Sequence, residues 1–212
     1  MKRLESNLKN MVLSLTLVSL VAAALLGGMY VLTEEPIAQT EQKKQMQAKI
    51  DVLPPTENIS FGDKQEIDGV TVYEAFAGNE RVGAAVETFD ANGFNGKFTL
   101  MVGFDNDGNI TGYTVLKQNE TPGLGANMIN WFKTDKGNQN VIGLNPAEKN
   151  MTVKKDGGDI DAITAATITS RAFLRAIVRA YNALPKEVIE DISLATDSVA
   201  IIVEQEIAEE NE

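Results

Sequence analysis

Hydroxyl side chains are concentrated in one short segment, residues 161–173, which reads DAITAATITSRAF. An amphipathic pattern follows it, so the segment is expected to begin a helix. The start of a helix carries unpaired N–H groups and about half a positive charge, and together these favour a bound phosphate. The hydroxyls of Thr167, Thr169 and Ser170 would lie beside such a phosphate. The residue types therefore permit a phosphate-binding or attachment site at this helix start.

An ordinary helix start is the competing interpretation of the same segment. Thr169 or Ser170 would then cap the helix through its hydroxyl, and Asp161 would be an unremarkable acidic residue. Ala165 and Ala166 are small, so they allow the close approach of a bulky group. On this segment alone, capping is the favoured interpretation.

The composition narrows the chemistry that the chain itself can supply. Its 212 residues include no cysteine and no histidine. Disulfides, thiolate nucleophiles, iron–sulfur clusters, cysteine-based zinc sites and histidine bases are therefore excluded. Any chemistry must use carboxylates, hydroxyls, backbone dipoles or an organic cofactor. The net charge of −11 argues against a nucleic-acid partner, because phosphate backbones are bound by basic surfaces.

The N-terminal part is expected to contain one membrane-spanning helix at residues 11–32, which carry no charged side chain. A helix of this length would be about 33 Å long, enough for a hydrocarbon core of about 30 Å. A cleaved signal peptide is the alternative, but its apolar region usually has only about 7–15 residues. We therefore favour an uncleaved anchor.

The charges that flank this helix predict its orientation. Three basic residues precede it and two acidic residues follow it: Lys2, Arg3, Lys9, Glu34 and Glu35. The positive-inside rule then places residues 1–10 in the cytoplasm. The main domain is accordingly expected on the outer (periplasmic or extracytoplasmic) side of the inner, or cytoplasmic, membrane.

Beyond the span, residues 33–57 are polar and rich in Gln and Lys, and they are expected to form a juxtamembrane helix and a linker. Pro54 and Pro55 are expected to end that helix. A folded domain is then predicted at residues 58–200. The last residues, 201–212, form an acidic tail whose composition is typical of disorder.

Alternating apolar residues within the domain predict antiparallel strands. Residues 70–76 and 81–89 flank a Gly-Asn turn, and two further strands flank the Asp-Gly turn at residues 105–109. That turn also faintly resembles a calcium loop, but position 12 counted from Asp105 is Leu116 rather than a glutamate. A tight turn is the favoured interpretation, and no metal site is predicted.

The strongest helical pattern in the domain covers residues 170–183, in which Phe173, Ile177 and Tyr181 share one face. A further strand and turn are expected at residues 150–161. Strands combined with few helices predict an α+β domain with an antiparallel sheet.

A second segment gives the first one a more specific meaning. The stretch GYTVLKQNETPGLGA at residues 112–126 is followed later by DAITAATITSRA. In this order, behind a membrane anchor, the two motifs resemble an FMN-binding domain family. Its members include the G subunit of the Rnf electron-transport complex and the C subunit of the sodium-pumping NADH:quinone reductase. The resemblance covers most of the extracytoplasmic domain.

In that family, FMN is joined through its phosphate to a threonine hydroxyl, as a phosphoester. The modified residue is the last of a D-x-x-[S/T]-G-A-[T/S] pattern, and this resemblance assigns the role to Thr167. Asp161, Thr164 and Ala166 match other positions of the pattern. Ala165 departs from it, because the family usually has glycine there. An alanine would slow the modification if the backbone at this position needs a positive φ angle.

The resemblance also implies flavin contacts in the ETPGLG loop. Backbone N–H groups of a glycine-rich turn can donate to the oxygens of a flavin ring, and Leu124 would pack on one of its faces. Glu120 would either orient the loop through a hydrogen bond or lie near the flavin and disfavour its anionic reduced forms. Trp131 is expected in the core rather than at the flavin. The predicted contacts besides the attachment motif are Glu120, Thr121, Gly123, Leu124, Gly125 and Thr169.

The expected function is that of a membrane-anchored flavoprotein subunit in an ion-translocating electron-transport complex of the Rnf type. Electrons would pass between neighbouring redox subunits through FMN on Thr167, and the chain would have no independent catalytic activity. The expected partners are the other membrane subunits and, during maturation, a magnesium-dependent flavin transferase that takes FMN from FAD.

Two other functions fit the sequence. The chain would be a C subunit of the quinone reductase if its neighbouring subunits belonged to that complex, although its short length favours the Rnf type. It would be a membrane-anchored assembly module if the flavin site were vestigial, and Ala165 is the one feature that favours this function. The FMN content of the purified protein separates the redox functions from the assembly module.

Overall fold

A computed structural model describes residues 8–185 of the chain. The acidic tail predicted at residues 201–212, and the last part of the domain predicted at residues 58–200, lie outside the described residues. The chain divides into two units, residues 1–45 and 46–212.

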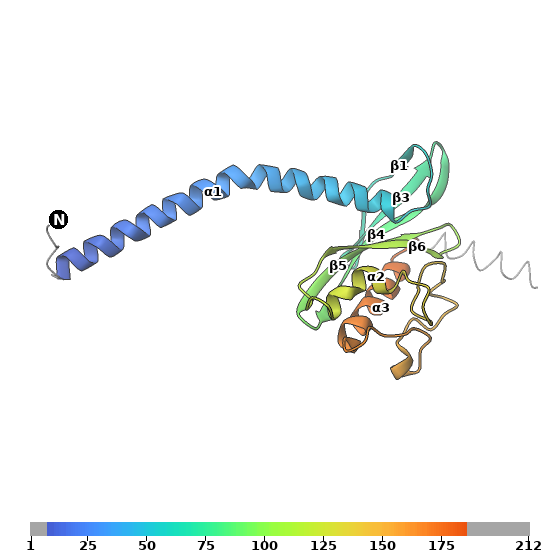
Figure 1. Cartoon of the computed structure of the whole chain (residues 1–212). Helices are drawn as coiled ribbons and strands as arrows, with labels where there is room; N and C mark the ends of the chain where they lie inside the picture. Colours follow the sequence, from blue (N-terminus) through green and yellow to red (C-terminus); the bar gives the residue numbers. More distant parts are fainter. Residues whose placement is uncertain (1–7, 186–212) are drawn as a thin grey trace, which may run out of the picture. The chain divides into compact units, whose positions relative to one another are not determined.

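The first unit contains most of a single helix, α1 (Leu8–Asp51), which includes Pro36 in its interior (Figure 1). The predicted membrane span and the predicted juxtamembrane helix are therefore continuous. Among the described residues, α1 is the helix that is long and apolar enough to cross a membrane. The hydroxyls of Ser14 and Thr16 donate to the helix's own carbonyls at Met11 and Val12. This bonding allows polar side chains to sit in apolar surroundings.

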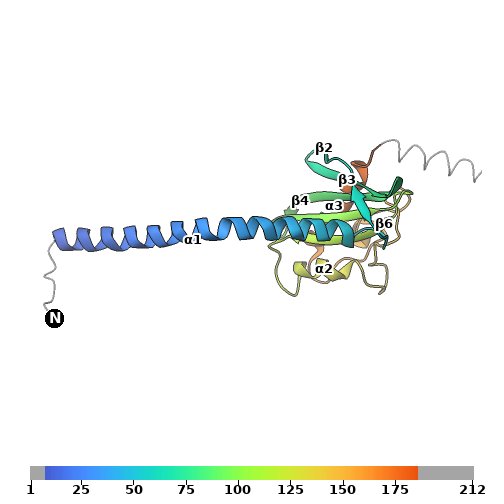
Figure 2. The same cartoon turned by 90° about the horizontal axis from the view of Figure 1, so that it is seen from above.

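The second unit is built on an antiparallel sheet of six strands, which confirms the predicted fold class (Figure 2). The strand order is β1-β3-β4-β5-β6, and β2 pairs with the edge of β3. Apolar residues explain β3 and β4, whose buried side chains are divided between two hydrophobic cores. The strands are β1 (Ile59–Phe61), β2 (Gln65–Ile67), β3 (Val70–Ala77), β4 (Glu80–Gly93), β5 (Gly96–Phe104) and β6 (Ile110–Lys117).

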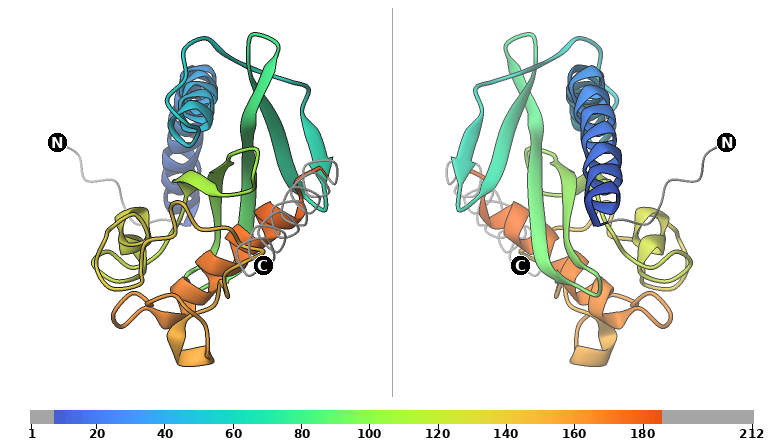
Figure 3. Two further views of the ribbon diagram at one scale, coloured as in Figure 1. Left: turned by 90° about the vertical axis from the view of Figure 1, so that its right-hand side faces the viewer. Right: turned by 90° about the vertical axis from the view of Figure 1, so that its left-hand side faces the viewer.

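One face of the sheet packs against α3 (Thr167–Asn182) in the main hydrophobic core (Figure 3). Phe173 lies at its centre, stacked on Phe132 at 4.3 Å between ring centroids and edge-on to Tyr113 at 4.8 Å. A buried hydrogen bond joins the two layers, because the Thr88 hydroxyl donates to the Ala176 carbonyl over 3.0 Å. The predicted helix face of α3 therefore anchors the helix firmly on the sheet.

The opposite face of the sheet carries a second, smaller core. Ala48, Val52 and Leu53 pack there against Met101 and Ala85. The compact unit consequently begins at Met46, within the stretch for which a juxtamembrane helix and linker were predicted. Apolar residues at the end of α1 cause this difference, since they complete the second core.

The connections contain short helical turns: η1 (Gly125–Asn127), α2 (Met128–Trp131) and η2 (Lys154–Asp156). The strand predicted at residues 150–161 is wrong, since only an isolated bridge joins Val153 and Ile160. Gly157 adopts a left-handed conformation, with φ of 85°, and closes a tight turn after η2. That turn leaves too few extended residues for a strand.

The turn at residues 105–109 is the tight hairpin turn that was favoured over a calcium loop. The Asp105 carboxylate accepts the backbone N–H groups of Asp107 and Asn109, at 2.9 and 2.8 Å. It also accepts the Asn109 side-chain amide. The carboxylate is thus engaged in the turn, and no cluster of acidic residues suited to a metal ion occurs within residues 8–185.

Candidate functional site

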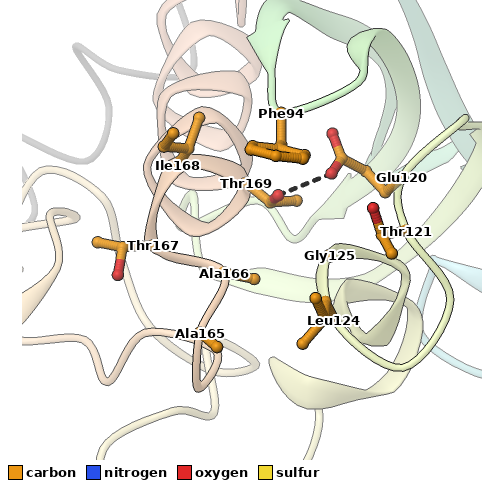
Figure 4. A pocket seen from close by; sticks show the side chains of 10 residues that line it. All are labelled: Phe94, Glu120, Thr121, Leu124, Gly125, Ala165, Ala166, Thr167, Ile168 and Thr169. Carbon is orange, nitrogen blue, oxygen red and sulfur yellow. Dashed lines mark hydrogen bonds between the residues drawn. The ribbon is translucent and has the colours of Figure 1, made fainter.

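A cavity of about 300 Å³ lies where the start of α3, the ETPGLG loop and the β4–β5 turn meet (Figure 4). In the view of Figure 4, Phe94 lies above a hydrogen bond between Thr169 and Glu120, and Ala165 and Leu124 lie below it. Three chain segments that are distant in sequence therefore build one site. The lining residues are Phe94, Glu120, Thr121, Leu124, Gly125, Ala165, Ala166, Thr167, Ile168 and Thr169.

The helix at this cavity begins without a side-chain cap. Its N-cap residue is Ala166, and Thr167 is its first residue. The predicted capping by Thr169 or Ser170 is wrong, because Thr169 donates to Glu120 while Ser170 donates to the Ala166 carbonyl and accepts the Ile163 N–H. The first N–H groups of a helix have no partner within it. The start of α3 therefore retains its capacity to bind an anion.

The residue before the N-cap has an unusual backbone conformation. Ala165 has a φ angle of 60°, in the left-handed region. Only Asn58 and Asp68 share a positive φ among the described residues other than glycine. The left-handed conformation costs an L-residue roughly 1–2 kcal/mol, a cost that glycine avoids. The backbone here does need a positive φ, so a glycine would fit this position without strain.

Glu120 is the structural centre of the cavity wall. Its side chain is buried, and its two oxygens accept separate hydrogen bonds. Oε2 accepts the Thr169 hydroxyl over 2.8 Å, and Oε1 accepts the Asn95 N–H over 3.2 Å. The carboxylate thereby joins the ETPGLG loop to α3 and to the β4–β5 turn. Of the two predicted roles, the structure supports the orientation of the loop.

The Glu120 carboxylate fits into its position because the two residues beside it, Gly93 and Gly125, have no side chain. A Cβ atom at Gly93 would approach Oε1 of Glu120 at 2.6 Å, which is closer than real Cβ contacts allow. A Cβ atom at Gly125 would collide with Oε2 and would stand 2.7 Å from the Thr169 hydroxyl oxygen. The second glycine of the PGLG sequence is therefore required by close packing.

The ETPGLG loop is held by its own hydrogen bonds. The N–H groups of Leu124 and Ala126 both donate to the Thr121 carbonyl, over 3.1 and 3.2 Å. These two donors are consequently engaged within the loop and are not free for a flavin oxygen. Gly123, with φ of 76°, makes the reversal possible and lies outside the cavity lining. Leu124 projects at the rim, where 41% of its surface is exposed.

Comparison with known proteins identifies the family of the domain that contains this cavity. A model of the FMN-binding domain matches residues 93–182, a range that contains every lining residue of the cavity. The G subunit of the ion-translocating oxidoreductase complex of Aliivibrio fischeri is 32% identical over 190 residues, which cover 82% of this chain and 89% of the relative. The corresponding G subunit of Yersinia pestis is 36% identical over 183 residues, covering 79% and 86%.

The chain belongs to the family of G subunits of ion-translocating oxidoreductase complexes. A shorter match, to the G subunit of Shewanella amazonensis, is 42% identical over 112 residues and covers 51% of each chain. These matches confirm the resemblance to the Rnf G subunit that the two motifs indicated. They also confirm that the domain is of the FMN-binding type.

Two residues of the DAITAAT motif, Asp161 and Thr164, lie outside the cavity lining. Thr164 is exposed on the loop before α3. Asp161 accepts the Asn138 N–H over 2.7 Å and pairs with the Lys154 ammonium at 2.9 Å. These partners hold the pKa of the Asp161 carboxyl below its usual range, the Asn138 hydrogen bond most strongly. Asp161 is thus placed to hold the loop before α3 rather than to line the cavity.

The predicted core position of Trp131 agrees with the structure. Its ring is half-buried and packs against the main core, and its indole N–H donates to the Asp161 carbonyl over 3.0 Å. Trp131 is not one of the residues that line the cavity. It supports the site indirectly, because it fixes the backbone at Asp161.

Sequence reasoning missed two lining residues, Phe94 and Ile168. Phe94 occupies the two-residue turn between β4 and β5, and Ile168 is the second residue of α3. A bulky apolar side chain within a Gly-Phe-Asn-Gly turn is a signal that was available, because turns usually favour small polar residues. Ile168 gave no comparable signal, since an isoleucine in a helix suggests core packing.

Proposed function

We propose that this chain is a membrane-anchored flavoprotein subunit of an Rnf-type complex and that it carries FMN as a phosphoester on Thr167. One observation supports Thr167 as the attachment site. Thr167 is the first residue of an uncapped helix at the edge of an apolar cavity. A phosphate on this hydroxyl would lie at the N–H groups of the first helical turn, where the helix dipole stabilises it.

The residues of the cavity fit the two ends of FMN. Apolar and small side chains dominate the lining, which suits a flat uncharged ring, whereas the helix start suits a phosphate. The cavity volume of about 300 Å³ lies at the lower end of the range for small-molecule sites. It therefore suits the enclosure of part of the cofactor and leaves the remainder at the surface, as an electron relay requires.

Attachment would use the Thr167 hydroxyl as the nucleophile. Its oxygen would form a bond to the FMN phosphorus of FAD, the bond from that phosphorus to AMP would break, and the hydroxyl proton would leave to a base. The chain has no histidine or cysteine for this work. The base and the magnesium ion would accordingly belong to a separate flavin transferase. Ala166 and the exposed Thr164 leave the approach to Thr167 uncrowded.

Once bound, FMN would supply the redox chemistry, because it accepts electrons one or two at a time. The chain's own residues would bind it, orient it and hold it near the partner subunits. The apolar part of α1 would anchor the domain in the inner membrane, with the N-terminus in the cytoplasm. The other membrane subunits of the complex would be the permanent partners.

The experiment that tests attachment is co-expression of the full chain with a flavin transferase, followed by intact-mass measurement and in-gel flavin fluorescence. Wild type is expected to gain the mass of one FMN phosphoester. Thr167→Ala is expected to lose it, whereas Thr167→Ser, which keeps a hydroxyl at the helix start, is expected to retain it. A wild-type chain without the added mass would contradict the redox function and support the assembly module. A fluorescent Thr167→Ala would contradict the site.

A further inference from the structure

Three bulky apolar side chains lie at the rim of the cavity, outside the hydrophobic cores of the protein. Phe94 is 63% exposed, Ile168 48% and Leu124 41%. They come from the β4–β5 turn, the first turn of α3 and the ETPGLG loop, and all three line the same cavity. Exposed apolar residues that converge on one hollow mark a binding site rather than chance exposure.

The turn that carries Phe94 is held in place from the cavity side. Its neighbour Asn95 donates its backbone N–H to Glu120, and its side-chain amide donates to the Thr121 hydroxyl over 3.1 Å. Gly93 and Gly96 pair across the turn. Phe94 is thus presented on a fixed support although its ring is largely exposed. A firmly positioned, exposed aromatic ring is suited to stacking on another flat ring.

The surface formed by Phe94, Ile168 and Leu124 carries no charged side chain. Glu120 is the one charged residue of the lining, and it is 5% exposed with both oxygens hydrogen-bonded inside the wall. The chain as a whole carries a net charge of −11, so a neutral rim is a local exception. This rim suits an uncharged aromatic ring and offers no partner to a phosphate. The phosphate would bind at Thr167, at the edge of the same cavity.

We propose that Phe94 is the aromatic contact of the isoalloxazine ring and that Ile168 and Leu124 complete an apolar wall around it. This inference rests on the proposed function, because it assumes that FMN is attached at the start of α3. It goes further by assigning an aromatic contact of the ring to Phe94, which lies outside both sequence motifs, and by adding Ile168 to the contact with Leu124 that the ETPGLG motif implied. Phe94 acts as a binding residue, and the attachment reaction at Thr167 does not require it.

The test uses the flavinylated full chain in detergent, and it measures the accessibility of the flavin by iodide quenching of its fluorescence. Phe94→Ala is expected to raise the quenching constant about two- to tenfold, which corresponds to the stabilisation that an aromatic pair adds beyond area burial. Phe94→Trp is expected to lower the flavin fluorescence itself, because a stacked indole quenches flavins by electron transfer. The matched control is Ile129→Ala, an exposed apolar residue outside the lining, which should change neither quantity.

The outcomes separate this inference from the proposed function. If wild type carries no FMN, both fail. If all variants carry FMN and Phe94→Ala and Phe94→Trp behave like Ile129→Ala, the ring contact is overturned while the attachment stands. If Phe94→Ala folds but fails to receive FMN, the separation of ring binding from attachment is overturned. Far-UV circular dichroism establishes folding in each case.

Discussion

Oε2 of Glu120 accepts a hydrogen bond from the Thr169 hydroxyl over 2.8 Å, across a separation of 49 residues. The bond is buried, and it joins the ETPGLG loop to the first turn of α3. The two sequence motifs that indicated the family are therefore in direct contact. The shape of the cavity depends on the contact between Glu120 and Thr169. The same carboxylate also accepts a hydrogen bond from the β4–β5 turn.

Replacement of Glu120 by alanine is expected to lower the free energy of unfolding by about 1–3 kcal/mol, since it leaves the Thr169 hydroxyl and the Asn95 N–H without their acceptor. Urea unfolding followed by circular dichroism measures the loss. Glu57→Ala, at an exposed glutamate, is the control and should be near neutral. Equal stability of the Glu120 and Glu57 variants would contradict the role given to this carboxylate.

The two glycines of PGLG should respond differently to alanine. Gly125→Ala places a Cβ atom against Glu120 and Thr169 and should disrupt the cavity wall. Gly123→Ala meets no atom within 4 Å, so only its positive φ of 76° opposes the change. That strain costs roughly 1–2 kcal/mol. We therefore expect Gly125→Ala to lower FMN incorporation more than Gly123→Ala does, as measured by in-gel fluorescence; the reverse order would refute the packing argument.

Ala165→Gly is expected to stabilise the protein by about 1 kcal/mol, because glycine adopts the φ of 60° without strain. The midpoint of urea unfolding should rise with an unchanged slope. Ala91→Gly, in strand β4 where φ is not positive, should instead destabilise by about 0.5–1 kcal/mol. FMN should enter the Ala165→Gly variant at least as fast as wild type. A destabilised Ala165→Gly would show that the backbone conformation is misassigned.

Acid should weaken the loop before α3 through Asp161. The pKa of this carboxyl is lowered in the folded state by the Asn138 N–H and then by Lys154. A lowered pKa means that the stabilisation is complete above the unfolded value of about 3.9 and is lost as the pH falls through the folded value. Asp161→Asn should therefore flatten the decline in stability below about pH 4.

Much of the fold followed from local patterns. Alternating apolar residues predicted β3 and β4, and the Asp-Gly turn predicted the hairpin of β5 and β6, because an apolar pattern with a regular period identifies an element directly. The amphipathic face around Phe173 predicted α3 for the same reason. The predicted strand at residues 150–161 failed because a left-handed glycine turned the chain back too early.

The site could be predicted only in part. The two motifs supplied Thr167 and the ETPGLG loop, but a sequence does not show that Glu120 reaches Thr169, since this contact depends on the folding of distant segments. The start of α3 at Thr167 was also missed, because its N-cap is an alanine that makes no side-chain hydrogen bond. The glycine usual in the motif suggested that the backbone at residue 165 could need a positive φ angle, and Ala165 has one.

The most direct test of the account is peptide mapping of the flavinylated chain by fragmentation mass spectrometry. Trypsin cleaves after Lys155 and Arg171, so one peptide, residues 156–171, contains all the candidate hydroxyls. These are Thr164, Thr167, Thr169 and Ser170. We expect one FMN phosphoester on this peptide, located on Thr167. An unmodified peptide from cells that contain an active flavin transferase, or an FMN located on any of the other three hydroxyls, would contradict it.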